Sequence, residues 1–215
     1  MNAESQITTV FDSLKQKIIV GEYPPRAPLY EVQLASQYGV SRNTIKKVLL
    51  MLKSENLVIV ELNKGAKVKA VSIEEIKEFL EIRAALERFI AMKTVPVISE
   101  DSLNKMEKLL EKMNQNIQER NLLEYSNNNL LFHDIIYGAC PNKTAVEMTT
   151  SLKTQMRRYN TKTILVPGRD QSSLEEHSAI LQAFQKRDVK EAEKLVEQHV
   201  LNVKKTFEEN FLLIS

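Results

Sequence analysis

Apolar residues recur every three or four positions through the first 54 residues, in three separate stretches. This spacing predicts amphipathic helices. The expected helices cover 5–20, 31–38 and 42–54. The segment "GEYPP" stops the first helix and Gly39 ends the second. Ser41 is suited to cap the third helix, because its hydroxyl can accept a hydrogen bond from a first-turn N–H. The last two helices are therefore predicted to be joined by a tight turn.

Two short stretches with β-strand character follow the third helix. They read "LVIVEL" (57–62) and "AKVKAV" (66–71), and "NKG" lies between them. Alternating and β-branched residues around such a turn are typical of a β-hairpin. Three helices followed by a hairpin predict a winged helix-turn-helix over residues 1–71.

From Ser72 onward the helical period of apolar residues continues to the end of the chain. A capping box, Ser72 with Glu75, begins this part. Five more helices are expected at about 100–119, 122–138, 142–164, 172–187 and 189–212. Six helices with short connections predict an all-α antiparallel bundle. The sequence thus predicts a mainly α protein with two domains, 1–71 and 72–215.

Charge is distributed unevenly between the two predicted domains. Residues 1–71 contain ten Lys and Arg against six Asp and Glu, a net charge of +4, whereas residues 72–215 contain twenty against twenty-two, a net charge of −2. A basic first domain suggests contact with a polyanion, although scattered surface charge is the alternative. There is one cysteine, no apolar run long enough for a membrane span and no secretory signal pattern, so a cytoplasmic protein is expected.

The first turns of the predicted third helix carry polar and basic side chains opposite its apolar stripe. In a helix-turn-helix these positions reach base edges and phosphates in the major groove. Arg pairs with guanine, Asn pairs with adenine, and Lys suits phosphates. A polar helix start exposed only to solvent is the alternative. Together with the preceding helix and the basic hairpin tip, the pattern favours DNA contact by Arg42, Asn43, Thr44, Lys46, Lys47, Lys64 and Gly65.

Residues 29–68 resemble the winged helix-turn-helix of the GntR family of bacterial transcriptional regulators. The stretches "LYEVQLA" and "GVSR", the pair Leu57-Val58 and the wing glycine Gly65 match the family pattern. The departures are Asn43-Thr44 in place of Thr-Pro, Lys46 in place of Arg, and Arg26 in place of Gly. Because Lys lacks the planar fork of Arg, the operator is expected to differ from the common family site.

The three histidines of the chain all lie in the helical part. His177 and His199 are each eleven residues from the turn between the last two predicted helices, so their imidazoles would be level in a helical hairpin. Asn129 precedes His133 by four residues and shares its helical face. Converging imidazoles suit zinc, nickel, iron or copper. Three unrelated histidines beside a core stripe are the alternative.

Residues 72–212 resemble the FCD ligand-binding domain of the FadR branch of the GntR family. The matching stretches are "RAALE" (83–87), "NLLFH" (129–133), "EHSAILQAF" (176–184) and "EQHV" (197–200). The resemblance implies a metal site at His133, His177 and His199 together with Asn129, which stands where the family usually has Asp. An amide oxygen is a weaker ligand than a carboxylate. Weaker metal binding, or a site that is metal-free in practice, both remain open.

Several arginines of the helical part are candidates for binding an effector carboxylate. Arg83 shares the register of apolar residues on its helix, and the family places an effector-contacting Arg there. Arg157 and Arg158 are neighbours, so at most one of them faces a pocket. Arg169 is a further candidate.

The sequence and the resemblance together predict a homodimeric DNA-binding transcriptional regulator that is not an enzyme. Each N-terminal domain would read half of a palindromic operator, and each bundle would bind a small acid with a divalent metal ion. A regulator that responds without metal to a larger ligand such as an acyl-CoA is the alternative. A metal-dependent hydrolase is a further one, but no general base stands at a fitting spacing.

Overall fold

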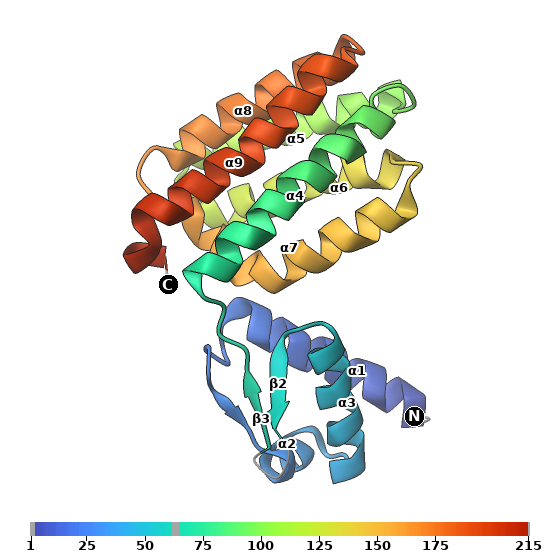
Figure 1. Ribbon diagram of the computed structural model, residues 1–215, viewed down its shortest axis with the longest axis vertical. Helices are drawn as coiled ribbons and strands as arrows, with labels where there is room; N and C mark the ends of the chain where they lie inside the picture. The colour runs from blue at the N-terminus through green and yellow to red at the C-terminus, as the bar shows by residue number, and fades with distance from the viewer. Residues whose placement is uncertain (1–2, 62–64, 215) are drawn as a thin grey trace. The chain divides into compact units, whose positions relative to one another are not determined.

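The computed structural model describes residues 3–61 and 65–214 (Figure 1). The chain divides into two compact units, with the division between Ser72 and Ile73. Within the described residues, the first unit contains three helices and a small sheet, and the second contains six helices. The fold class predicted from the sequence, a winged helix-turn-helix followed by an all-α bundle, is confirmed.

The helices of the first unit pack around a small apolar core of their own. They are α1 (Ala3–Val20), α2 (Glu31–Tyr38) and α3 (Arg42–Ser54). Leu14 of α1 and Ile45 and Leu52 of α3 are fully buried in this core. Gly39 ends α2 in the left-handed conformation, at φ 64°, where a side chain would be strained. The predicted cap of α3 is also confirmed, since Ser41 Oγ accepts from the Thr44 N–H at 3.1 Å.

The sheet of the first unit contains one strand more than the sequence predicted. The hairpin strands β2 (Val58–Glu61) and β3 (Gly65–Val68) pair antiparallel, with Val58 opposite Val68. The additional strand β1 (Pro28–Leu29) lies on the other side of β3 and pairs antiparallel with it. A strand of two residues, the first of them a proline, carries too little periodicity to be recognised in the sequence, so only the pairing with β3 reveals it.

The second unit is a helical bundle. Its helices are α4 (Ile73–Thr94), α5 (Glu100–Gln118), α6 (Leu122–Ala139), α7 (Lys143–Thr163), α8 (Arg169–Gln185) and α9 (Val189–Ile214). Helices α4 and α9 lie side by side along much of their length (Figure 1). Phe132 and Tyr125 of α6 and Phe184 of α8 are fully buried in the core between the helices. None of the described helices is both long and apolar enough to cross a membrane.

Helix α8 begins three residues earlier than the sequence predicted. Gly168 precedes it with φ 79°, a conformation that glycine adopts without strain. The Gly168 carbonyl accepts from the Ser172 N–H at 3.1 Å and from the Ser172 hydroxyl at 2.9 Å, so the first turn of the helix is complete. The earlier start places Arg169 on α8, the helix that also carries Glu176 and His177.

Candidate functional site

Helix α3 presents one apolar face and one polar face. Ile45, Val48 and Leu52 are buried in the core of the first unit. On the other face Arg42, Asn43, Lys46 and Lys47 are exposed, and Thr44 is half-buried with its hydroxyl 2.9 Å from that of Ser41. The residues predicted to contact DNA therefore lie together at the exposed start of one helix.

An acidic side chain of the neighbouring helix holds two of these cations. Glu31 Oε2 of α2 lies 3.4 Å from Arg42 Nη2 and 4.0 Å from Lys46 Nζ. Exposed pairs of this kind contribute little to stability, but they orient long side chains. Of the predicted wing residues, Gly65 begins β3 and is exposed, whereas Lys64 lies outside the described residues.

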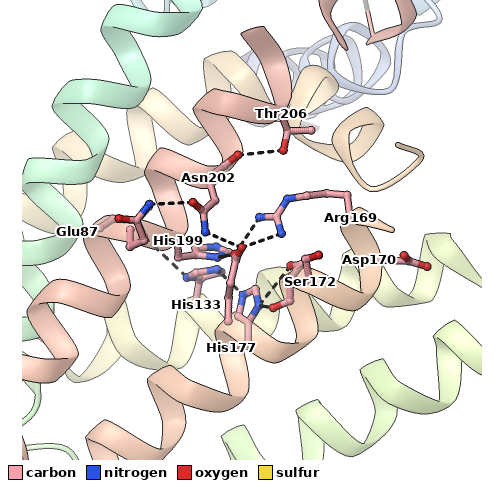
Figure 2. Close-up of polar contacts among 12 residues, drawn as sticks. Glu87, His133, Arg169, Asp170, Ser172, His177, His199, Asn202 and Thr206 are labelled. Carbon is pink, nitrogen blue, oxygen red and sulfur yellow. Dashed lines mark hydrogen bonds and ion pairs between the residues drawn. The ribbon is translucent and has the colours of Figure 1, made fainter. Parts of the chain in front are cut away.

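The three histidines of the helical unit converge on one point. They come from three different helices, His133 from α6, His177 from α8 and His199 from α9. Their ring centroids lie 4.5–5.3 Å apart, and one ligand nitrogen from each lies within 4.8 Å of the others (Figure 2). All three rings are buried. Residues that are far apart in the sequence thus form one cluster, as the helical hairpin predicted for two of them.

Outward hydrogen bonds orient the imidazoles. His177 Nδ1 lies 2.5 Å from the Ser173 carbonyl, which can only accept, so this nitrogen carries the proton. His199 Nδ1 lies 2.6 Å from Glu176 Oε2. With Nδ1 protonated, the Nε2 atoms of His177 and His199 keep their lone pairs. His177 Nε2 lies 3.0 Å from His133 Nε2, a separation that requires a proton or a cation between two nitrogen lone pairs.

Burial favours the neutral form of the clustered histidines. It lowers the pKa of His133 and that of His177 well below the usual range, and the neighbouring cations and imidazoles lower both further. Burial also lowers the pKa of His199, although Glu176 opposes this. Neutral imidazole is the form that binds a metal ion.

Asn129 contributes a polar atom beside the histidines. It lies one helical turn before His133 on α6, and both residues line the same cavity. Among the described residues, the buried Asn129 Oδ1 has no hydrogen-bond donor. Buried polar atoms usually have a partner, so an orphaned acceptor here fits a ligand to a cation. The four predicted ligands are consistent in type with a divalent transition metal.

Two carboxylates, Glu176 and Glu87, lie next to histidines of the cluster. The sequence alone had indicated no role for either. Glu176 binds Arg169 through both oxygens at 2.9 and 3.1 Å, as well as His199. Burial alone would raise the pKa of Glu176, but the hydrogen bond from His199 and the charge of Arg169 lower it well below its usual range. Glu87 pairs with Arg83 at 2.5 Å, and its second oxygen lies 3.9 Å from His133 Nδ1.

A cavity of about 500 Å³ adjoins the cluster, within the size range of small-molecule sites. Of the predicted effector residues, Arg83 and Arg157 line it, and the side chain of Arg158 lies outside the described residues. Arg169 also lines the cavity, but Glu176 already engages both of its terminal nitrogens. Lys153 of α7 is a lining cation that no pattern in the sequence singled out.

Comparisons with known proteins agree with both units of the fold. The family model described as "Bacterial regulatory proteins, gntR family" matches residues 6–68, and the model described as "FCD domain" matches residues 78–202. The chain belongs to the gntR family and carries an FCD domain. Both matches are to transcriptional regulators, so the prediction of a regulator rather than an enzyme is confirmed.

Two curated proteins and one solved structure illustrate the similarity of this gntR regulator to others. The gluconate operon transcriptional repressor of Bacillus subtilis (strain 168) is 26% identical over 180 residues, 81% of this chain and 74% of that protein. The HTH-type transcriptional repressor RspR of Escherichia coli (strain K12) is 22% identical over 194 residues, 90% and 85% of the two chains. The structure of E. coli McbR/YncC has a TM-score of 0.78 at 24% identity and covers 95% of this chain and 98% of its own.

Of the site residues that were not predicted in this gntR regulator, two have a recognisable signal in the sequence and one has none. Glu176 directly precedes His177 in the matching "EH" pair, and Glu87 follows Arg83 by four residues, one helical turn later. Both carboxylates therefore had a local signal. Lys153 had none, because it reaches the cavity only through the packing of α7 in the bundle.

Proposed function

We propose that this gntR regulator is a repressor whose operator binding changes when its helical unit binds a small carboxylate together with a divalent metal ion. The two curated relatives described above are named as repressors, which supports repression over activation. A DNA-binding regulator of this kind would act in the cytoplasm. The observation that carries the effector part is the inward orientation of the three imidazoles.

The metal proposal rests on the direction of each imidazole. Nδ1 of His177 and Nδ1 of His199 are hydrogen-bonded away from the cluster, which turns their Nε2 atoms toward one another and toward His133. Outward hydrogen bonds of this kind orient metal-bound histidines in proteins. With Asn129 as a fourth and neutral ligand, the bound ion would keep its full double charge and would attract an effector carboxylate. Arg157 lines the same cavity and adds positive charge, and Arg83, which is paired with Glu87, lines it as well.

The DNA proposal rests on the exposed start of α3. Arg42, Asn43, Lys46 and Lys47 are exposed there, on the face opposite the core, and Thr44 stands with them on the first turn. We propose that Arg42 and Asn43 read base edges and that the lysines bind phosphates. Gly65 would let the wing approach the backbone of the duplex, and Lys64 is proposed as its basic tip.

Regulation is proposed to act through a homodimer on a palindromic operator. A two-fold dimer presents two reading helices to two half-sites, so the spacing and freedom of the N-terminal units decide the affinity. An effector that binds one arrangement of the dimer better than the other shifts the population toward that arrangement.

The metal proposal is tested with protein purified without an affinity tag. Wild type, His177→Ala and Lys194→Ala are compared by elemental analysis and by competition with a chromogenic chelator; Lys194 is an exposed residue of α9 and serves as control. We expect about one ion per chain in wild type and in the control, and almost none in His177→Ala. An equal, near-zero content in all three proteins would refute the metal site and leave the metal-independent, acyl-CoA type of regulator.

The DNA proposal is tested with duplexes that wild type enriches from a random pool. Gel-shift titrations at one fixed salt concentration then compare wild type, Arg42→Ala and Lys53→Ala, an exposed lysine at the far end of α3. Loss of a bidentate Arg contact is expected to weaken specific binding by about tenfold or more, with dimerisation unchanged. Unchanged binding by Arg42→Ala would refute the assignment of the reading helix.

A further inference from the structure

Lys153 of α7 lines the cavity beside the histidine cluster. Its Nζ lies 4.5 Å from the ring centroid of Tyr137, as in a cation–π contact, and 3.2 Å from the Tyr137 hydroxyl. Both residues line the cavity. The tyrosine therefore holds a flexible side chain in one place and in one direction.

The carboxylates of Glu87 and Asp134 attract this ammonium, but among the described residues neither forms an ion pair with it. Arg83 pairs with Glu87, and Arg169 pairs with Glu176, so these two arginines are already neutralised. Among the described residues no carboxylate forms an ion pair with Lys153; its Nζ contacts Tyr137. Burial lowers the pKa of Lys153 to about 8 against the opposing effect of Glu87, and the group still carries its charge at neutral pH. Lys153 is half-buried, and an anionic ligand would offset the cost of partly desolvating a cation that has no ion-pair partner.

Tyr137 also links Lys153 to the histidines. Its ring stacks on that of His133, with centroids 6.1 Å apart and planes inclined by 26°. Tyr137 thus contacts both Lys153 Nζ and one imidazole of the cluster, and Lys153, Tyr137 and His133 all line the same cavity. A short carbon chain with an acid group at each end offers one carboxylate to the cluster and one to the ammonium.

We propose that Lys153 determines effector specificity by binding the second acid group of a small dicarboxylate, whose first carboxylate binds at the histidine cluster. The inference rests on the proposed metal and carboxylate function and adds the class of acid. Tyr137 is the positioning residue that holds the ammonium. A monocarboxylate of the same chain length would make the first contact and leave Lys153 unpaired.

Acids of equal chain length with one or two carboxylates distinguish the contact at the histidine cluster from the contact at Lys153. Succinate is compared with butyrate, and glutarate with valerate, by calorimetric titration of the full-length protein with one equivalent of zinc. The proteins are wild type, Lys153→Met, Lys153→Arg and Lys194→Met; Met keeps the length of the side chain without its charge, Arg keeps the charge, and Lys194 is an exposed lysine of α9. Melting temperatures without ligand verify that each variant is folded.

We expect wild type and Lys194→Met to bind one of the dicarboxylates about tenfold or more tightly than its monocarboxylate, since a charge-assisted contact is gained. Lys153→Met should lose this preference while its affinity for the monocarboxylate changes less than about twofold, and Lys153→Arg should keep part of the preference. A preference that persists in Lys153→Met overturns the inference. Equal affinity of wild type for each dicarboxylate and its matched monocarboxylate also overturns the inference, but this outcome leaves the proposed function intact. If no acid binds wild type, both proposals fail.

Discussion

Substitution of Glu176 is expected to change both the stability of the protein and its affinity for metal. Its two carboxylate oxygens accept four hydrogen bonds: two from Arg169, one from His199 Nδ1 at 2.6 Å and one from the Asn202 amide at 2.8 Å. The substitution Glu176→Gln keeps the shape of the side chain but replaces one oxygen by an NH₂ group, which can only donate. Whichever oxygen is replaced, two of the four donors then face another donor.

The loss can be estimated from these contacts. Arg169 is 8% exposed and would lose its counter-charge. Removing one partner of a buried pair costs about 3 kcal/mol, and the remaining hydrogen bonds recover part of this. If the NH₂ group faces His199, its Nδ1 must become the acceptor, the proton moves to Nε2, and the lone pair that pointed into the cluster is lost. Changes to groups that orient metal ligands weaken metal binding about 10- to 100-fold.

Two measurements examine Glu176→Gln. Urea unfolding of the metal-free protein should show a free energy of unfolding lower by about 2–3 kcal/mol. Chelator competition should show the weaker metal affinity. Glu175→Gln is the matched control, because Glu175 is exposed and contacts only Gln171 among the described partners, at 3.2 Å. Metal affinity within twofold of wild type in Glu176→Gln, with metal bound to wild type, would refute the orienting role of Glu176.

Three other substitutions test separate parts of the molecule. Asn129→Asp should raise metal affinity by about tenfold, because a carboxylate adds negative charge to a neutral set of ligands; chelator competition measures it. Arg26→Gly should raise the free energy of unfolding by up to about 1 kcal/mol in urea titrations, because Arg26 has φ 69° and glycine adopts this conformation without strain. Leu52→Ala should destabilise the winged unit by about 3 kcal/mol, as seen by thermal unfolding, while metal affinity stays unchanged.

Each of these three has an outcome that contradicts it. Equal metal affinity of wild type and the Asn129→Asp variant would place this residue outside the ligand set. A less stable Arg26→Gly protein would mean that the arginine side chain contributes more than its backbone conformation costs. A large loss of metal affinity in Leu52→Ala would mean that the two units do not fold on separate cores, against the two apolar clusters observed.

The sequence alone predicted the elements of the fold and their order. Helix periodicity, the break at Gly39 and the cap at Ser41 are signals that act within a few neighbouring residues, and the structure contains each of them. The hairpin and the six helices of the second unit were predicted for the same reason. His177 and His199 are each eleven residues from the turn between the last two helices, so their level positions could also be predicted by counting along the chain.

Tertiary packing decided how the site is built. His133 meets His177 across 44 positions of the sequence, and Lys153 meets Tyr137 across 16, with no periodic signal for either contact. Strand β1 was missed because it exists only through its pairing with β3. The sequence by itself therefore determined which helices form and which imidazoles share a register. Only the packing of α6, α7, α8 and α9 determined which nitrogens point inward and which cation faces the cavity, because those depend on contacts between side chains that no local pattern connects.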